Sequence, residues 1–156
     1  MPDKIWLDNI KAFLSLEENK ILSICLYGES RGESWPGIIA CMNVIRNRVS
    51  KYSSFSDPAI TPYGNYMAVI MKKYQFSCFL SADPNRLKLE HIATDFNSYR
   101  DTDTILGKIY FMCTIKEHIM DNTSGATHYF TDGITPPSWS QQMTQTIKIG
   151  HHMFFK

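Results

Sequence analysis

The sequence predicts a mainly α-helical domain with a small β element near its C-terminal end, a mainly α (α+β) fold class. Three observations support this prediction. Apolar residues recur at helical spacing up to about position 121, turn-forming residues cluster after it, and 156 residues suffice for one well-packed core but not for two. We therefore expect residues 1–156 to form a single domain without an internal boundary or linker.

Six helices follow from the apolar periodicity. Ser15 and Glu18 form a capping-box pattern before the second helix, Ser34 precedes the third, and Asp83-Pro84 opens the fifth. The sixth is rich in isoleucine and methionine and is expected to lie in the core. The predicted ranges are 7–14, 17–28, 36–50, 64–73, 84–99 and 104–121.

Loops and short strands account for the rest of the chain. The segment 54–63 contains Pro58 and Pro62 and is predicted to be a loop. Short strands are predicted at 127–130 and 146–150, in a region that turn residues and prolines interrupt.

Charge and hydropathy exclude two classes of partner. The net charge is +1 and no stripe of lysine and arginine is present, which argues against a nucleic-acid partner. No apolar run approaches the length of a membrane span, so we expect no stable membrane association. The N-terminal residues lack the layout of a secretory signal, and we expect synthesis in the cytoplasm.

Cysteine and histidine spacing predicts no metal and no cofactor. The four cysteines are far apart and form no paired-ligand pattern, so zinc is not expected, and a disulfide is neither required nor excluded. The histidines show no H-E-x-x-H or similar spacing. These residues are Cys25, Cys41, Cys78 and Cys113, and His91, His118, His128, His151 and His152.

The stretch 27–34, Tyr-Gly-Glu-Ser-Arg-Gly-Glu-Ser, carries the strongest functional signal. It follows an apolar helical pattern and holds two acidic side chains, an arginine and two glycines. A glutamate at the end of a buried helix has its charged form disfavoured by desolvation, which raises its pKa toward the value that a general acid needs at neutral pH. Glu29 is therefore the leading candidate for a catalytic acid.

Glu33 has two interpretations. Four residues after Glu29, it would be a second carboxylate on the same face if the helix continued. If Gly32 interrupts the helix, Glu33 would instead pair with Arg31 or Arg48, or cap the next helix.

Four blocks, in order, resemble the bacterial and phage cell-wall hydrolases that include the spore cortex-lytic enzyme SleB. The resemblance extends from about Leu22 to Phe155. Ser30, His151 and Phe155 depart from the family pattern, which more often has alanine, asparagine and tyrosine there. The blocks are 27–34 with Gly37 and Ala40, 44–49, 75–78, and a C-terminal set of 125–129, 137–139 and 149–155.

The resemblance implies a lysozyme-like fold that acts on peptidoglycan glycan strands as a lytic transglycosylase. In that scheme one glutamate protonates the glycosidic oxygen between N-acetylmuramic acid and N-acetylglucosamine. It then accepts the proton of the muramyl C6 hydroxyl, which closes a 1,6-anhydro ring. A glycosidase that uses water needs two carboxylates at a defined separation. The next acidic residues after Glu33 are Asp57, Asp83 and Glu90, and none of them lies in a block that looks catalytic. Glu29 therefore stands largely alone, which favours the transglycosylase, with a hydrolysing muramidase as the alternative.

Several residues are candidates for substrate binding, each with a structural alternative. Gln75 and Ser77 either bind sugar hydroxyl and acetamido groups or close a loop. Thr127 and Tyr129 alternate along a predicted strand, and the resemblance implies that Tyr129 stabilises positive charge on the sugar. Either they face the cleft or they belong to an ordinary strand.

Trp139 and the histidines complete the candidate set. Trp139 either stacks on a sugar ring or is a buried aromatic residue. His152 matches a family position and is expected to support the site by hydrogen bonding. His128 is predicted to point to the opposite face from Tyr129 and to be structural.

Three rival classes remain at this stage. A cysteine peptidase or amidase would pair a cysteine with a histidine base, a zinc amidase would recruit several histidines, and a wall-binding module would lack catalysis. Buried cysteines, unorganised histidines and the presence of Glu29 make each of them weaker.

The resemblance and the lack of a recognisable wall-binding segment suggest a phage endolysin. Such an enzyme is expected to act as a monomer, to stay in the host cytoplasm until a holin opens the membrane, and then to reach the wall. A thin Gram-negative wall would suit it. A bacterial spore or cell-wall enzyme is the alternative.

Overall fold

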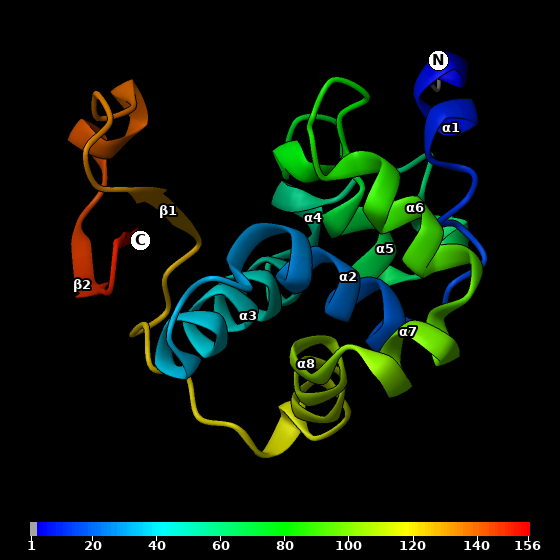
Figure 1. Cartoon of the computed structure of the whole chain (residues 1–156). Coiled ribbons are helices and arrows are strands. Elements are labelled where there is room, and N and C mark those ends of the chain that lie inside the picture. Colours follow the sequence, from blue (N-terminus) through cyan, green and yellow to red (C-terminus); the bar gives the residue numbers. More distant parts are fainter. Residues whose placement is uncertain (1–2) are drawn as a thin grey trace.

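Helix α2 (Glu18–Ser30) runs through the centre of the helical part of the protein (Figure 1). Its residues from Ile21 to Tyr27 are all buried. It packs against four other helices, α3 (Trp35–Ser50), α5 (Asn65–Ile70), α6 (Arg86–Thr94) and α8 (Thr104–Thr114). This arrangement explains why α2 reads as an almost continuous apolar run: a helix surrounded by neighbours is hydrophobic around most of its circumference.

The computed structural model describes residues 3–156, and it confirms the mainly helical fold class with a small C-terminal sheet. The remaining helices are short. They are α1 (Lys4–Ile10), α4 (Tyr52–Phe55) and α7 (Phe96–Thr102), with 3₁₀ turns η1 (Thr61–Tyr63), η2 (Ser77–Phe79), η3 (Lys116–His118) and η4 (Ser138–Gln142).

Three predicted helix boundaries were wrong for local reasons. The first helix begins at Lys4 because the side chain of Asp3 accepts a hydrogen bond from the backbone N–H of Trp6. The predicted helix 84–99 is broken at Asp95, whose φ of −138° and ψ of 57° are not helical. The predicted helix 104–121 ends at Thr114 and continues as the separate turn η3.

Two smaller predictions also need correction. The cap of α2 is Glu17, whose carboxylate accepts from the N–H of Asn19, and not a capping box from Ser15. The predicted loop 54–63 contains the end of α4 and the turn η1. Ser34 does occupy the N-cap position of α3, although its side chain makes no capping hydrogen bond.

The C-terminal region forms a three-stranded antiparallel sheet of order β1-β3-β2. Its strands are β1 (His128–Thr131), β2 (Gln145–Ile149) and β3 (His152–Phe155). Both predicted strands are present, but β3 was not predicted as a strand. Tyr129 pairs with Phe154 in the β1–β3 register, and the β2–β3 pairing is irregular between Gln145 and Ile147.

Side chains from α3 attach this sheet to the helices. The amide of Asn47 donates to the backbone carbonyl of Ala126 at 2.9 Å and to the carboxylate of Asp121 at 3.0 Å. From the next residue, Nε of Arg48 donates to the carbonyl of Thr127 at 2.7 Å. The end of α3 therefore fixes the chain just before β1, which sets the position of that strand relative to α2.

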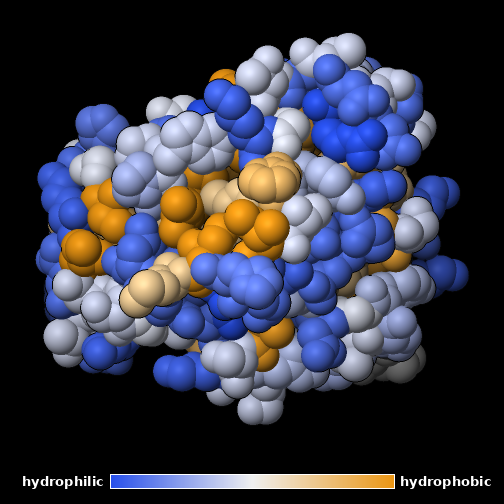
Figure 2. All heavy atoms as spheres, turned by 90° about the horizontal axis from the view of Figure 1, so that it is seen from below, coloured by the Kyte–Doolittle hydropathy of each residue, from blue (hydrophilic) through white to orange (hydrophobic). Residues whose placement is uncertain are grey.

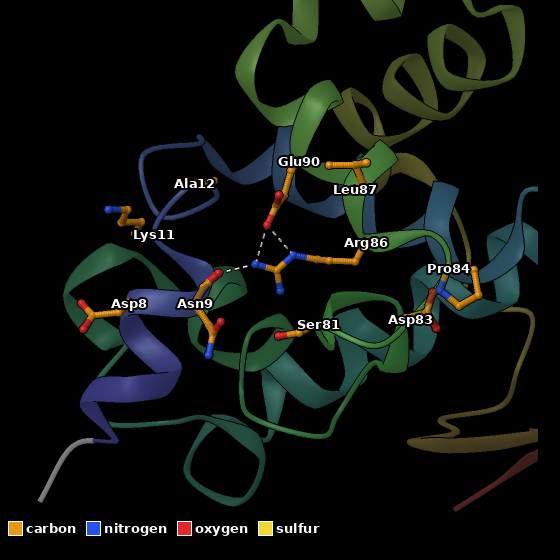
Figure 3. Close-up of a pocket in the computed structure, with 10 residues that line it drawn as sticks. All are labelled: Asp8, Asn9, Lys11, Ala12, Ser81, Asp83, Pro84, Arg86, Leu87 and Glu90. Carbon is orange, nitrogen blue, oxygen red and sulfur yellow. Dashed lines mark hydrogen bonds and ion pairs between the residues drawn. The ribbon is translucent and has the colours of Figure 1, made fainter.

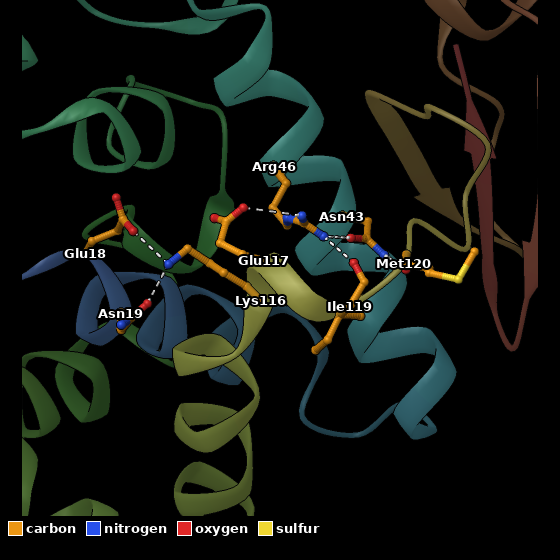
Figure 4. A network of polar contacts seen from close by, with 8 residues as sticks. All are labelled: Glu18, Asn19, Asn43, Arg46, Lys116, Glu117, Ile119 and Met120. Atoms are coloured by element: carbon orange, nitrogen blue, oxygen red, sulfur yellow. Dashed lines mark hydrogen bonds and ion pairs between the residues drawn. The ribbon is translucent and has the colours of Figure 1, made fainter.

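A second polar network holds the segment after α8 (Figure 4). The ammonium group of Lys116 lies 2.7 Å from both Glu18 and Asn19 of α2. Arg46 of α3 donates to the carbonyl of Ile119 at 2.7 Å and to Asn43 at 3.0 Å. Because the chain between η3 and the sheet lacks regular structure, these bonds replace a helix or strand in defining its path.

Apolar side chains remain exposed around α8, on the side of the molecule that Figure 2 shows. They include Ile105, Phe111, Ile115 and, beyond the helix, Met120, which is 87% exposed. Within residues 3–156, no helix has the length and apolar character of a membrane span.

Candidate active site

Glu29 lies in the last turn of α2, one residue before the helix ends at Ser30. Its carboxylate faces two groups from distant parts of the chain. The backbone N–H of Cys78, in η2, donates to Oε1 at 3.4 Å, and the hydroxyl of Tyr129, in β1, donates to Oε2 at 3.5 Å. Both bonds are long, so they favour the ionised form only weakly.

Burial controls the protonation of Glu29. Desolvation raises its pKa above the ordinary value of 4.5, and this effect outweighs the hydrogen bonds from Cys78 and Tyr129, which act in the opposite direction. The negative charge of Asp83 raises the pKa further. The prediction that burial at the end of α2 would favour the neutral acid therefore agrees with the geometry of this residue.

Gly28 allows η2 to approach α2 closely. A Cβ atom at this position would lie 2.9 Å from Sγ of Cys78 and 2.9 Å from Cδ1 of Leu89. Real side chains do not approach so closely, so any larger residue here would push η2 or α6 away. The glycine thus permits the contact between the backbone of Cys78 and Glu29.

Glu33 is directed elsewhere. Gly32 is not helical, and α2 ends before it. Oε1 of Glu33 lies 4.0 Å from Nε2 of His152. Oε2 lies so near Gly150 that a Cβ atom added to this glycine would be 2.8 Å from it. The carboxylate therefore packs against the turn between β2 and β3, where Gly150 has a φ of +57°.

The partners proposed for Glu33 from the sequence were wrong. Arg31 donates to the carbonyl of Tyr27 at 2.9 Å and to the side chain of Asn85 at 2.7 Å, and Arg48 bonds to other groups. The carboxylate of Glu33 lies instead 4.0 Å from His152, which is beyond hydrogen-bond distance, so hydrogen bonding by His152 at the site stays a prediction.

His152 also approaches a cysteine, in an arrangement that superficially resembles a nucleophile–base pair. Its Nδ1 lies 3.8 Å from Sγ of Cys41. However, Cys41 is 1% exposed, and burial raises the pKa of its thiol to about 12. Burial also lowers the pKa of His152. The thiol is therefore neutral and inaccessible at neutral pH, which argues against the cysteine-enzyme alternative. The four cysteines are free and buried.

A cavity of about 300 Å³ adjoins Glu29 through Tyr129. It brings together three of the residues predicted to bind substrate, Gln75, Tyr129 and Trp139. The sequence did not predict that three further residues line the same cavity, because they come from separate segments. These residues are Arg48, Tyr74 and His128.

His128 requires a correction, because it lies in the wall of this cavity and not away from the site. Its ring contacts Trp139 at 4.9 Å and Phe55 at 5.8 Å between ring centroids. Nδ1 lies 2.9 Å from the hydroxyl of Thr127. Burial, and then the charge of Arg48, lower its pKa, so the imidazole is neutral at pH 7.

Two other predicted binding residues do not line the cavity. Ser77 is exposed at the start of η2. Thr127 is buried, and its hydroxyl and carbonyl are engaged by His128 and Arg48. Its position fits structural support of the site better than contact with a ligand.

A larger cavity, of about 550 Å³, lies between α1 and α6 (Figure 3). Its central cation, Arg86, is already engaged by Glu90 and by the carbonyls of Phe79 and Asn9. Asp83 lines this cavity, and its negative charge is the one that raises the pKa of Glu29. Within the described part of the chain, no cluster of three or more histidine, cysteine or acidic residues forms a metal site.

The close packing at Gly28 gives a stability prediction. Gly28→Ala is expected to lower the free energy of unfolding by about 1–3 kcal/mol, because the added methyl group overlaps Cys78 and Leu89. Gly32→Ala is the matched control. No atom lies within 4 Å of its Cβ position, so the change should be neutral or stabilising by up to about 1 kcal/mol. Urea unfolding measures both, and a Gly28→Ala variant as stable as the Gly32→Ala variant would contradict this interpretation.

Comparison with solved structures shows which proteins this chain is similar to. The catalytic domain of the germination-specific lytic transglycosylase SleB from Bacillus anthracis aligns with 90% of this chain and 97% of its own length, at 26% identity and a TM-score of 0.58. The catalytic domain of SleB from Bacillus cereus aligns over 90% and 91%, at 26% identity and a TM-score of 0.52. No curated protein sequence matches the chain.

The profile of the Cell Wall Hydrolase family matches residues 32–155. This range starts after Glu29 but includes the cavity residues and the whole C-terminal sheet. Because the match covers most of the sequence, the protein belongs to the cell wall hydrolase family.

Proposed function

We propose that this enzyme degrades peptidoglycan by cleaving the β-1,4 bond between N-acetylmuramic acid and N-acetylglucosamine, as a lytic transglycosylase. The observation that carries the proposal is the partly buried acid Glu29, whose pKa is raised and whose carboxylate accepts a hydrogen bond from Tyr129, a residue that lines the cavity. The similarity to two SleB catalytic domains, one of them that of a germination-specific lytic transglycosylase, supports it.

In the first step, the protonated carboxyl of Glu29 donates its proton to the glycosidic oxygen. The bond between this oxygen and C1 of the muramyl residue breaks, and the N-acetylglucosamine part leaves with a new hydroxyl group. Positive charge develops on the muramyl ring as the bond breaks. This step needs a protonated acid, and burial raises the pKa of Glu29 in the direction that favours it.

In the second step, the muramyl C6 hydroxyl attacks C1 of the same residue. The carboxylate of Glu29 accepts the hydroxyl proton, which restores the acid and closes the 1,6-anhydro ring. The nucleophile belongs to the substrate, so its proximity supplies much of the rate and no water has to be positioned. Tyr129 keeps its proton, because burial raises its pKa, and its hydroxyl can stabilise the transient carboxylate.

The surroundings of Glu33 favour this mechanism over one with two catalytic carboxylates. Glu33 packs against Gly150 and lies near His152, at the turn between β2 and β3. We therefore assign Glu33 to positioning the C-terminal sheet.

A hydrolysing muramidase is the second candidate, because Asp83 is close enough for its charge to raise the pKa of Glu29. Oδ1 of Asp83 accepts a hydrogen bond from the backbone N–H of Asn85, which leaves Oδ2 without a partner among the described residues. In a glycosidase with two carboxylates, this group would activate water.

We also propose a role in phage-driven host lysis, which rests on the sequence resemblance alone. Genes for small holin-like membrane proteins beside this gene would support the role. A position among spore or cell-wall genes would contradict it.

Product analysis tests the reaction. With purified peptidoglycan, the wild type should release fragments that end in 1,6-anhydromuramic acid, one water lighter than hydrolysed ends in mass spectrometry. Glu29→Gln should release none, because the amide cannot donate the proton, whereas Glu117→Gln, which changes an exposed carboxylate, should behave like the wild type. Asp83→Asn should keep the anhydro product.

Two outcomes would contradict the proposal. Reducing muramic acid ends from the wild type, lost in Asp83→Asn, would identify a muramidase. Cut stem peptides without glycan fragments would exclude glycosidic cleavage.

The raised pKa of Glu29 predicts a pH-dependent difference in stability. Folding favours the protonated acid, so this contribution is fully present below pH 4.5 and is lost as the pH rises through the folded pKa. Glu29→Gln carries no charge at any pH. It should therefore unfold at a higher temperature than the wild type at pH 7–8, with the difference disappearing below pH 4.5.

Calorimetry or thermal circular dichroism between pH 4 and pH 8 measures this difference. Glu117→Gln is the control, since Glu117 is exposed and its loss should give no such gain. Equal unfolding temperatures of the wild type and Glu29→Gln at pH 8 would show that burying the charge costs nothing.

A further inference from the structure

Among the buried cations of residues 3–156, Arg48 is the one that forms no ion pair with a carboxylate. It is 7% exposed, and it lines the cavity beside Tyr129. We propose that Arg48 and Gln75 form a subsite that binds a carboxylate of the peptidoglycan strand during the reaction proposed above.

The hydrogen bonds of Arg48 leave donors directed at the cavity. Nε donates to the carbonyl of Thr127 at 2.7 Å, and Nη1 donates to Oε1 of Gln75 at 3.2 Å. Nη2 has no partner among the described residues. In residues 3–156, every fully buried side-chain nitrogen makes a hydrogen bond. Since Nη2 makes none, it is accessible, and the cavity that Arg48 lines is the space it is open to.

The charge of Arg48 is also uncompensated in comparison with the other buried cations. Arg86 lies 2.7 Å from Glu90, and Lys116 lies 2.7 Å from Glu18. The lining of the cavity around Arg48 contains no acidic residue. Arg48 packs against the rings of Phe55 and Phe76, so its charge is poorly hydrated and available to an anion.

Gln75 supplies a second donor. Its amide oxygen accepts from Arg48, so the NH₂ group is at the other end of the amide and makes no hydrogen bond to another described residue. Two neighbouring donors, one of them charged, match the two oxygens of a carboxylate. The aromatic residues Trp139 and Tyr74 in the same cavity offer apolar faces for the attached sugar.

A peptidoglycan strand carries carboxylates of two kinds. The lactyl group of muramic acid is a free carboxylate where the stem peptide has been removed, and an amide where the peptide is attached. The stem peptide itself has carboxylates at its side chains and its end. Both kinds present the same chemical group to Arg48. Strands with and without stem peptides are therefore needed to tell which carboxylate binds.

The experiment measures binding of soluble glycan strands to the Glu29→Gln protein, which separates binding from turnover. The probes are strands stripped by an amidase, intact peptide-bearing strands, and each of these after carbodiimide coupling to methylamine, which neutralises the carboxylates. Gln75→Glu, added to Glu29→Gln, places a negative charge in the cavity and keeps the acceptor for Arg48. Asn97→Asp, on the exposed face of α7, is the matched charge control.

The subsite predicts at least about tenfold tighter binding of charged strands than of their coupled forms, as expected for a charge-assisted pair. Gln75→Glu should reduce this preference to near parity, and Asn97→Asp should preserve it. A preference confined to stripped strands identifies the lactyl carboxylate, and one confined to intact strands identifies the stem peptide.

Equal binding of charged and coupled strands would overturn the subsite, as would a preference that Gln75→Glu leaves unchanged. These outcomes are separate from the fate of the proposed function. Anhydro products from the wild type together with charge-independent binding would remove the subsite alone. Wild-type protein that cuts no glycosidic bond would remove the proposed function, whatever the binding result.

Discussion

The desolvation of one carboxyl group, that of Glu29, is the interaction on which the rest of the site depends. The last turn of α2 is surrounded by packed helices, and Gly28 allows η2 to close against it. The groups that reach Glu29, Cys78 and Tyr129, make only long hydrogen bonds. Burial without strong compensation raises the pKa of Glu29, so the packing of the helical core and the proposed proton transfer have the same physical origin.

Arg48 connects this acid to the C-terminal sheet. It bonds the chain before β1 through Thr127 and the loop before η2 through Gln75, and it packs between Phe55 and Phe76. These contacts set where Tyr129 and the neighbouring cavity lie relative to α2. A buried guanidinium can fulfil this structural role and still present one nitrogen to a ligand, because it carries five N–H donors in a fixed plane.

Local sequence signals predicted the helical core and Glu29, because apolar periodicity and burial at a helix end act over a few residues. The strand 152–155 was missed, because its pairing with β1 and β2 defines it and no local pattern does. The partners of Glu33 were wrong for the same reason: the turn at Gly150 meets it only after the sheet has folded. The cavity around Arg48 joins segments far apart in the chain, so sequence alone offered no sign that they meet.

The central claim is that the carboxyl of Glu29 stays protonated at pH values where ordinary glutamates are ionised. Carbon-13 NMR of the side-chain carboxyl groups, with Glu29 assigned by the signal missing in Glu29→Gln, measures this pKa directly in the folded protein. We expect Glu29 to titrate above its ordinary value of 4.5. A Glu29 pKa at or below 4.5 would contradict the account, because the proposed acid would then be ionised before it could donate its proton.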